Sequence, residues 1–91
     1  MKTKYPRGVL SVTDNGGATI DRYTVVFEPQ NICGELWYPM LTMSARPRHP
    51  QGVGISSTVR QPPRLTRHDH PISFLALPVG CQHLVDDYLR D

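Results

Sequence analysis

The sequence is poor in the residue patterns that most catalytic and metal sites require. Its two cysteines, Cys33 and Cys81, lie far apart, so the closely spaced ligand pairs of a structural zinc site are missing. His68 and His70 flank one aspartate, but beside a proline in a loop they are interpreted as surface histidines. Cys81 and His83 would diverge by about 200° on a helix, which keeps this thiol and imidazole apart. We therefore expect no catalytic residues, no metal and no cofactor.

Long apolar segments are also missing. No window approaches the length of about eighteen apolar residues that a membrane span needs, and residues 1–6 lack the apolar core of a signal peptide. We therefore expect a cytoplasmic protein without a membrane partner. In a reducing compartment two buried thiols are favoured over a disulfide between Cys33 and Cys81, although pairing stays open if their Cα atoms approach within about 7 Å.

Lysine is scarce, and arginine supplies the positive charge of the central segment. The net charge is +2, but residues 46–70 hold five arginines against Asp69 alone, so the excess is concentrated there. Arginine suits planar, bidentate contact with carboxylate or phosphate. With one neighbouring histidine, the candidate binding residues are Arg46, Arg48, His49, Arg60, Arg64 and Arg67.

The same segment contains no aromatic residue between positions 45 and 71. Proteins that bind single-stranded nucleic acid commonly stack bases on aromatic rings, so this absence weakens a nucleic-acid interpretation. An acidic protein surface is the favoured partner, and a small nucleic-acid-binding protein that uses the arginine-rich loops is the alternative.

The first half of the chain predicts strands. Ninety-one residues allow one domain, 1–91, with one modest core. Runs rich in β-branched residues, Val9–Thr13 and Ile20–Phe27, flank Asp14–Gly17, which is typical of a hairpin turn. Residues 35–44 predict a third strand that pairs with the second. Pro39 within it indicates an edge strand or a bulge, because proline donates no ladder hydrogen bond.

The second half predicts a loop region and a helix. Residues 45–71 are rich in proline and arginine, and we expect a loop there, interrupted by a short fourth strand within residues 52–59. Ile72 and Phe74 alternate like a short strand. Pro78 suits the first turn of a helix over residues 78–90. One stripe at helical spacing is apolar: Cys81, Leu84, Val85, Tyr88 and Leu89. The predicted fold is α+β, a mostly antiparallel sheet of three to five strands with one C-terminal helix.

Three segments carry a family resemblance. They are a strand with the residues Tyr-Thr-Val-Val-Phe at 23–27, the pattern Met-Ser-x-x-Pro-x-His-Pro-Gln-Gly at 43–52, and Leu-Pro-x-x-Cys-Gln at 77–82. In this order they resemble a group of small bacterial, phage and prophage proteins that has no established activity. The chain departs from the group at His70-Pro71, where a glycine and a basic residue often stand, and in its arginine-rich residues 60–67.

The resemblance implies a small cytoplasmic factor in a bacterial host cell. Such a factor acts on host proteins or on the genes of the mobile element, and inhibitors of host defence, such as anti-CRISPR proteins, are one class. The hypothesis is a non-enzymatic phage-type accessory or inhibitor protein that binds a host or phage protein stoichiometrically.

Overall fold

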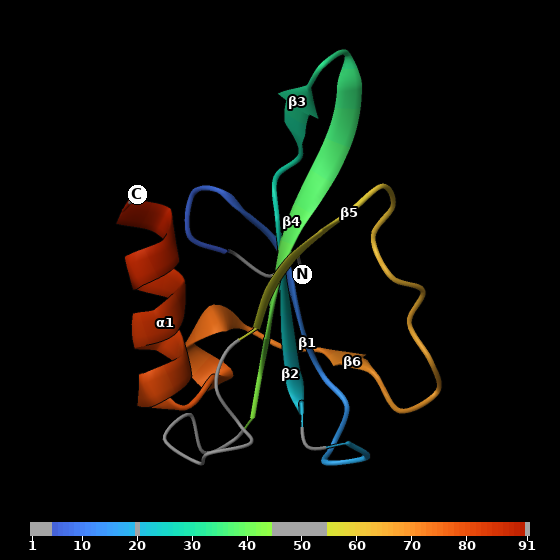
Figure 1. Cartoon of the computed structure of the whole chain (residues 1–91). Helices are drawn as coiled ribbons and strands as arrows, with labels where there is room; N and C mark the ends of the chain where they lie inside the picture. The colour runs from blue at the N-terminus through green and yellow to red at the C-terminus, as the bar shows by residue number, and fades with distance from the viewer. Residues whose placement is uncertain (1–4, 20, 45–54, 91) are drawn as a thin grey trace.

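The computed structural model describes residues 5–19, 21–44 and 55–90, which form one antiparallel sheet with a helix packed on it (Figure 1). In chain order the elements are β1 (Val9–Asp14), β2 (Tyr23–Phe27), β3 (Gln30–Ile32), β4 (Glu35–Met43), β5 (Ile55–Val59), β6 (His70–Pro71), a 3-10 helix η1 (Phe74–Ala76) and α1 (Val79–Arg90). The predicted α+β class is confirmed. The described sheet has six strands, because the short strands β3 and β6 add to those predicted.

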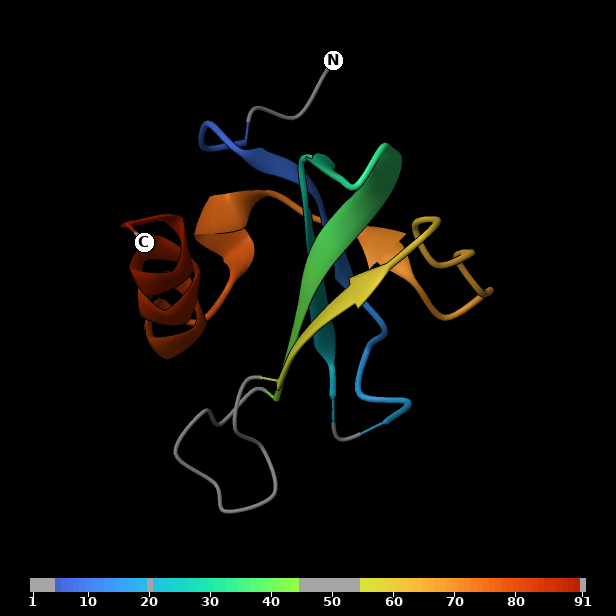
Figure 2. The ribbon, with the colours of Figure 1, turned by 45° about the horizontal axis from the view of Figure 1, so that its top comes forward.

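The strand order is β3-β4-β2-β1-β6, and β5 pairs with the other side of β4. Figure 2 shows β5 beside β4 and β6 beside β1, and the strand order places these two pairs at opposite edges of the sheet. The loop region predicted for residues 45–71 therefore contains two strands. The predicted fourth strand is confirmed over Ile55–Val59, and β6 was not predicted.

The predicted hairpin joins β1 and β2, but its loop is longer than expected. The amide of Asn15 donates to the carbonyl of Arg22 at 3.0 Å, and the Asn15 side-chain amide donates to the carbonyl of Asp21 at 3.1 Å. The Asn15 carboxamide oxygen accepts from the amides of Gly17 and Ala18. One asparagine thus organises the loop, and β2 begins only at Tyr23.

A second hairpin, between β3 and β4, turns on Cys33 and Gly34. Both residues have positive φ, 53° and 83°, as a two-residue type I′ turn requires. The turn exposes Cys33, whereas Cys81 is buried, and both thiols are free. The expectation of two thiols is therefore correct, but the expectation that both are buried is wrong.

Pro39 lies in an interior strand at an interruption of its ladder. β4 pairs with β5 on one side and with both β2 and β3 on the other, so the edge-strand interpretation is wrong. Between the pairs Val26–Met40 and Gln30–Trp37, residues 27–29 stand opposite only residues 38–39. This irregularity tolerates a residue that has no N–H donor, as the bulge interpretation expected.

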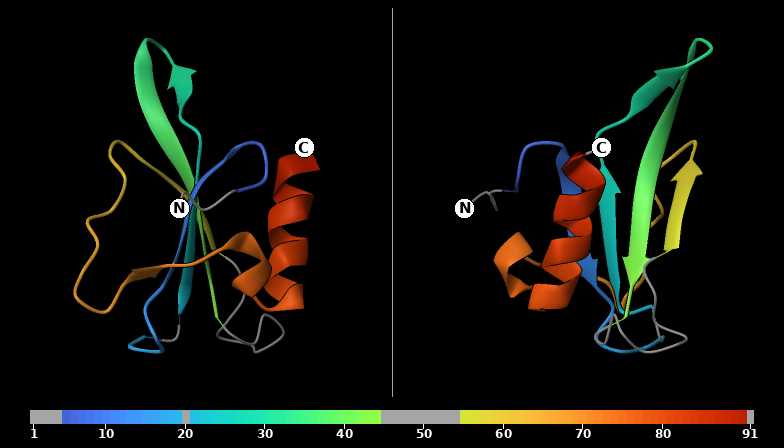
Figure 3. Two further views of the ribbon diagram at one scale, coloured as in Figure 1. Left: turned by 180° about the vertical axis from the view of Figure 1, so that it is seen from behind. Right: turned by 60° about the vertical axis from the view of Figure 1, so that its left-hand side comes forward.

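The core lies between α1 and one face of the sheet, as the views in Figure 3 show. Val12, Val25, Met43, Cys81 and Val85 are fully buried. Leu84, Tyr88 and Leu89 are partly buried and pack against this core, so the whole predicted stripe contacts it. Pro78 directly precedes α1, and its carbonyl accepts the first helical hydrogen bond from Gln82 at 3.0 Å.

The segment before α1 differs from the predicted strand. Ile72 extends the pairing at β6, because its amide donates to the carbonyl of Val12 at 3.0 Å. Phe74 instead begins η1, where the amide of Leu77 donates to the carbonyl of Phe74 at 3.1 Å. Among the described residues, no helix has the length and apolar character needed to cross a membrane.

Candidate functional site

Residues 60–69, which we call the crossing connection, run from one edge of the sheet to the other. They leave β5, which pairs with β4, and enter β6, which pairs with β1. Figures 1 and 3 show the crossing connection on the side of the sheet opposite α1. Residues 60–68 are all exposed. The segment that carries Arg60, Arg64 and Arg67 is therefore open to solvent along its length.

A turn over residues 66–69 shapes the end of the crossing connection. The carboxylate of Asp69 accepts from the Thr66 amide at 2.7 Å and from the Thr66 hydroxyl at 3.0 Å. The amide of Asp69 donates back to the Thr66 carbonyl at 3.1 Å, and the His68 amide donates to the Thr66 hydroxyl oxygen at 3.2 Å. The one acidic side chain of the segment thus stabilises its own turn.

Arg60 is held by two residues of β4. Its Nη1 lies 3.0 Å from Oε2 of Glu35, and its guanidinium lies 5.2 Å from the centroid of the Trp37 ring. The arginine and glutamate side chains are each more than half exposed, so the ion pair contributes little stability. The ion pair and the indole ring both occupy the guanidinium, which leaves less of Arg60 free for a partner.

The aromatic ring beside the arginine-rich segment is that of Trp37, which the sequence did not predict. Residues 45–71 contain no Phe, Tyr or Trp, and the ring comes from β4 instead. The sequence carries no signal for this contact, because the contact depends on the register of β5 on β4. Val59 pairs with Tyr38, so Arg60, the first residue after β5, lies beside Trp37.

Arg64 and Arg67 make no ion pair with any residue that the structure describes. Arg67 instead directs its Nε–H at Nε2 of His68, 3.4 Å away. These two arginines are brought onto one exposed segment, and Arg60 is tied to β4. The other candidate residues, Arg46, Arg48 and His49, lie outside the described residues.

A second charged cluster joins the ends of β1, β2 and β6. Arg22 Nε donates to Oδ1 of Asp14 at 2.8 Å, and its Nη2 donates to Oδ2 at 3.1 Å. The bond from Arg22 is the main cause that lowers the pKa of Asp14, and the amide of Gly16 adds to it. His70 pairs with Asp14 in the β1–β6 register. This cluster closes the hairpin loop and leaves Asp14 few free acceptor positions.

Cys81 shows no feature of an activated thiol. It is fully buried in the core, and burial raises the pKa of the thiol. Its sulfur donates to the carbonyl of Ser44 at 3.3 Å. His83 is exposed on the other side of α1, as the helical spacing predicted. Burial and a raised pKa keep the thiol protonated, so Cys81 serves here as a packing residue.

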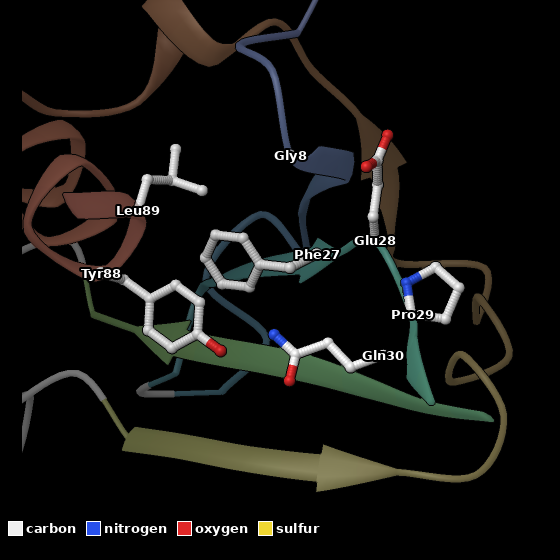
Figure 4. A pocket seen from close by; sticks show the side chains of 7 residues that line it. All are labelled: Gly8, Phe27, Glu28, Pro29, Gln30, Tyr88 and Leu89. Carbon is white, nitrogen blue, oxygen red and sulfur yellow. The ribbon is translucent and has the colours of Figure 1, made fainter. Parts of the chain in front are cut away.

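A hollow of about 270 Å³ lies between the C-terminal end of α1 and the junction of β2 with β3. Its lining residues, drawn in Figure 4, are Gly8, Phe27, Glu28, Pro29, Gln30, Tyr88 and Leu89. The Phe27 and Tyr88 rings stack with centroids 4.2 Å apart. Its walls offer one carboxylate, one carboxamide and the Tyr88 hydroxyl, which is too little to define a reaction.

The described residues include no cluster of three or more histidine, cysteine, aspartate or glutamate side chains that could hold a metal. Comparisons with protein-family models, with curated proteins and with solved structures found no match.

Proposed function

We propose that the chain is a non-enzymatic binding protein that associates stoichiometrically with an acidic protein surface through the crossing connection. One observation carries the proposal. The Asp69 carboxylate accepts bonds within its own turn, while Arg64 and Arg67 have no ionic partner among the described residues. Pro62 and Pro63 restrict the same segment, which reduces the entropy lost when it is ordered on a partner.

The biological setting of this proposal comes from the sequence motifs. Their resemblance to small phage and prophage proteins supports a cytoplasmic accessory or inhibitor protein whose partner is a host protein, for example a component of a defence system. Arg46, Arg48 and His49 belong to the proposed surface on the basis of their charge and their place in the sequence.

Capture from bacterial lysate tests the proposal. The tagged chain is compared with a double variant, Arg64→Glu with Arg67→Glu, and with a matched control, Arg7→Glu with Arg90→Glu. All four arginines are exposed, and both variants change the net charge equally. We expect one protein to be enriched by the wild type and the control and to be lost with the first variant. Equal capture by both variants would reject the crossing connection as the binding surface.

The alternative, direct nucleic-acid binding, has one observation in its favour. The Trp37 ring lies beneath the Arg60 guanidinium, so an aromatic residue does stand beside the cationic segment. If the five arginines of residues 46–67 contacted about five phosphates, the logarithm of duplex affinity would fall against the logarithm of salt with a slope near −4.5. Binding with that slope at physiological salt would favour this alternative over the protein partner.

A further inference from the structure

In the part of the chain that the structure describes, β5 is an edge strand without the features that usually protect an edge. Three strands, β3, β5 and β6, pair on one side only among the described residues. β3 has three residues, and β6 has two, one of them Pro71. β5 has five residues, Ile-Ser-Ser-Thr-Val, with no charge, proline or glycine. Such an edge is a template for pairing with another strand.

The backbone groups that β5 offers can be assigned from the ladder. Antiparallel pairs alternate between hydrogen-bonded and non-hydrogen-bonded, and one row of the sheet runs through Val12, Val25, Leu41 and Ser56. The Val12 carbonyl accepts a hydrogen bond from the Ile72 amide, so the backbone N–H and C=O of Val12 point toward β6. The pair Val12–Val25 is therefore not hydrogen-bonded. By the same alternation, the pair Val25–Leu41 is hydrogen-bonded and the pair Leu41–Ser56 is not. The N–H and C=O of Ser56 therefore point away from β4.

Thr58 follows the same alternation. It pairs with Pro39, which lies two residues from Leu41 and therefore falls in the same class of pair. Proline has no N–H to give, which agrees with a pair that is not hydrogen-bonded. The open edge of β5 thus presents the N–H and C=O groups of Ser56 and Thr58.

The sequence of β5 is self-complementary in this register. If two copies pair antiparallel about a two-fold axis at Ser57, Ser56 of each copy stands opposite Thr58 of the other. The same axis places Ile55 of each copy opposite Val59 of the other and Ser57 opposite Ser57, so in the sequence each position is matched by a residue of the same type. The outward N–H and C=O groups of Ser56 in one copy then bond those of Thr58 in the other, as the alternation of the ladder requires.

We propose that this chain forms a two-fold symmetric homodimer by antiparallel pairing of β5 with β5 of a second copy. A closed dimer needs a surface that complements itself, and β5 meets this condition in both residue type and hydrogen-bonding register. The axis stands perpendicular to the sheet, so one continuous sheet results, with both α1 helices on one face and both crossing connections on the other. The inference does not depend on the proposed function.

Sedimentation equilibrium of the full chain tests the dimer. We expect a mass that rises with concentration from 10.3 kDa toward twice that value. Ser57 faces its own copy at the axis, so Ser57→Lys or Ser57→Glu alone sets like charges opposite each other and raises the dissociation constant about tenfold or more. Mixing the two variants sets lysine opposite glutamate and restores the dimer.

A proline variant tests the edge itself. Thr58→Pro removes one outward N–H but no bond to β4, so we expect a monomer with unchanged circular dichroism. Ser57→Pro is the control, because it removes an N–H that faces β4 and lowers the melting temperature.

Three results would overturn the proposal. The first is a monomer up to about 1 mM, where even a millimolar dissociation constant gives a large dimer fraction. The second is a dimer that withstands Thr58→Pro. The third is a mixture of the lysine and glutamate variants that associates no better than either variant alone, which would point to a strand of another protein as the occupant.

Discussion

Gly8 combines an unusual backbone conformation with a close neighbour. Its φ is +94°, and a Cβ added there would lie 3.0 Å from Cδ2 of Leu89 on α1. Gly16 is a matched control, because its φ is +74° but nothing lies within 4 Å of an added Cβ. Gly16→Ala should cost about 1 kcal/mol of unfolding free energy through backbone strain alone.

Gly8→Ala should cost more than Gly16→Ala, because Leu89 must also move. Urea denaturation of both variants measures the difference. Equal costs would show that the contact between Gly8 and α1 is not tight.

Asp14 makes stability depend on pH. Its folded-state pKa is lowered below the ordinary value of an aspartate, chiefly by the hydrogen bond from Arg22. A lowered pKa means that the stabilising contribution is complete above the unfolded value and is lost as pH falls through the folded value. The contribution should therefore be present at pH 6 and disappear in strongly acidic solution.

Asp14→Asn should remove this dependence. Denaturation midpoints of the wild type and the variant should differ at pH 6 and converge as pH falls below the ordinary carboxyl range. Asp21→Asn serves as the control, since no ion pair to Asp21 is found among the described residues. A gap between wild type and Asp14→Asn that stays constant down to low pH would contradict the role of this carboxylate.

At the scale of the element, α1 offers two valines in opposite environments. Val85 is fully buried, whereas Val79 is 65% exposed. Val85→Ala should cost about 2 kcal/mol of unfolding free energy, since it removes buried methyl groups and leaves a cavity. Val79→Ala should change it by less than about 0.5 kcal/mol. Thermal melting compares the two, and similar losses would reject the observed helix orientation.

The elements that bury a face are those that the sequence could predict. The stripe from Cys81 to Leu89 repeats at helical spacing because one side of α1 must cover the sheet. β3 and β6 leave no such pattern, since every one of their residues is exposed. The alternation of Ile72 and Phe74 predicts a strand, but two residues fit one turn of a 3-10 helix equally well, and Phe74 begins η1.

Across the whole molecule, the sequence shows where charged residues are concentrated, but it does not show which of them pair with one another. The excess of arginine in residues 46–67 is visible without a structure. Arg60 contacts Glu35 and Trp37 only because β5 pairs with β4. Arg60 lies about twenty-five positions from these two residues in the sequence. The hydrogen bond that the Asp69 carboxylate accepts from the Thr66 amide is likewise seen only in the folded chain.

The arrangement of layers separates two surfaces of the molecule. α1 covers one face of the sheet, and the crossing connection lies on the other side (Figures 1 and 3). The open edge of β5 lies at neither surface. The proposed self-association through β5 and the proposed capture of a partner through Arg64 and Arg67 are therefore separable, and a variant at one surface should leave the other intact.

Arg64 and Arg67 lie at the centre of the protein-binding surface that we propose. Calorimetric titration of the chain with the protein that it captures measures what these two arginines contribute to the affinity. The wild type should bind at a fixed stoichiometry, and the double variant Arg64→Glu with Arg67→Glu should bind at least about tenfold more weakly, a loss typical of contact residues in an interface. The control variant Arg7→Glu with Arg90→Glu should bind like the wild type. An unchanged affinity in the first variant would contradict the claim.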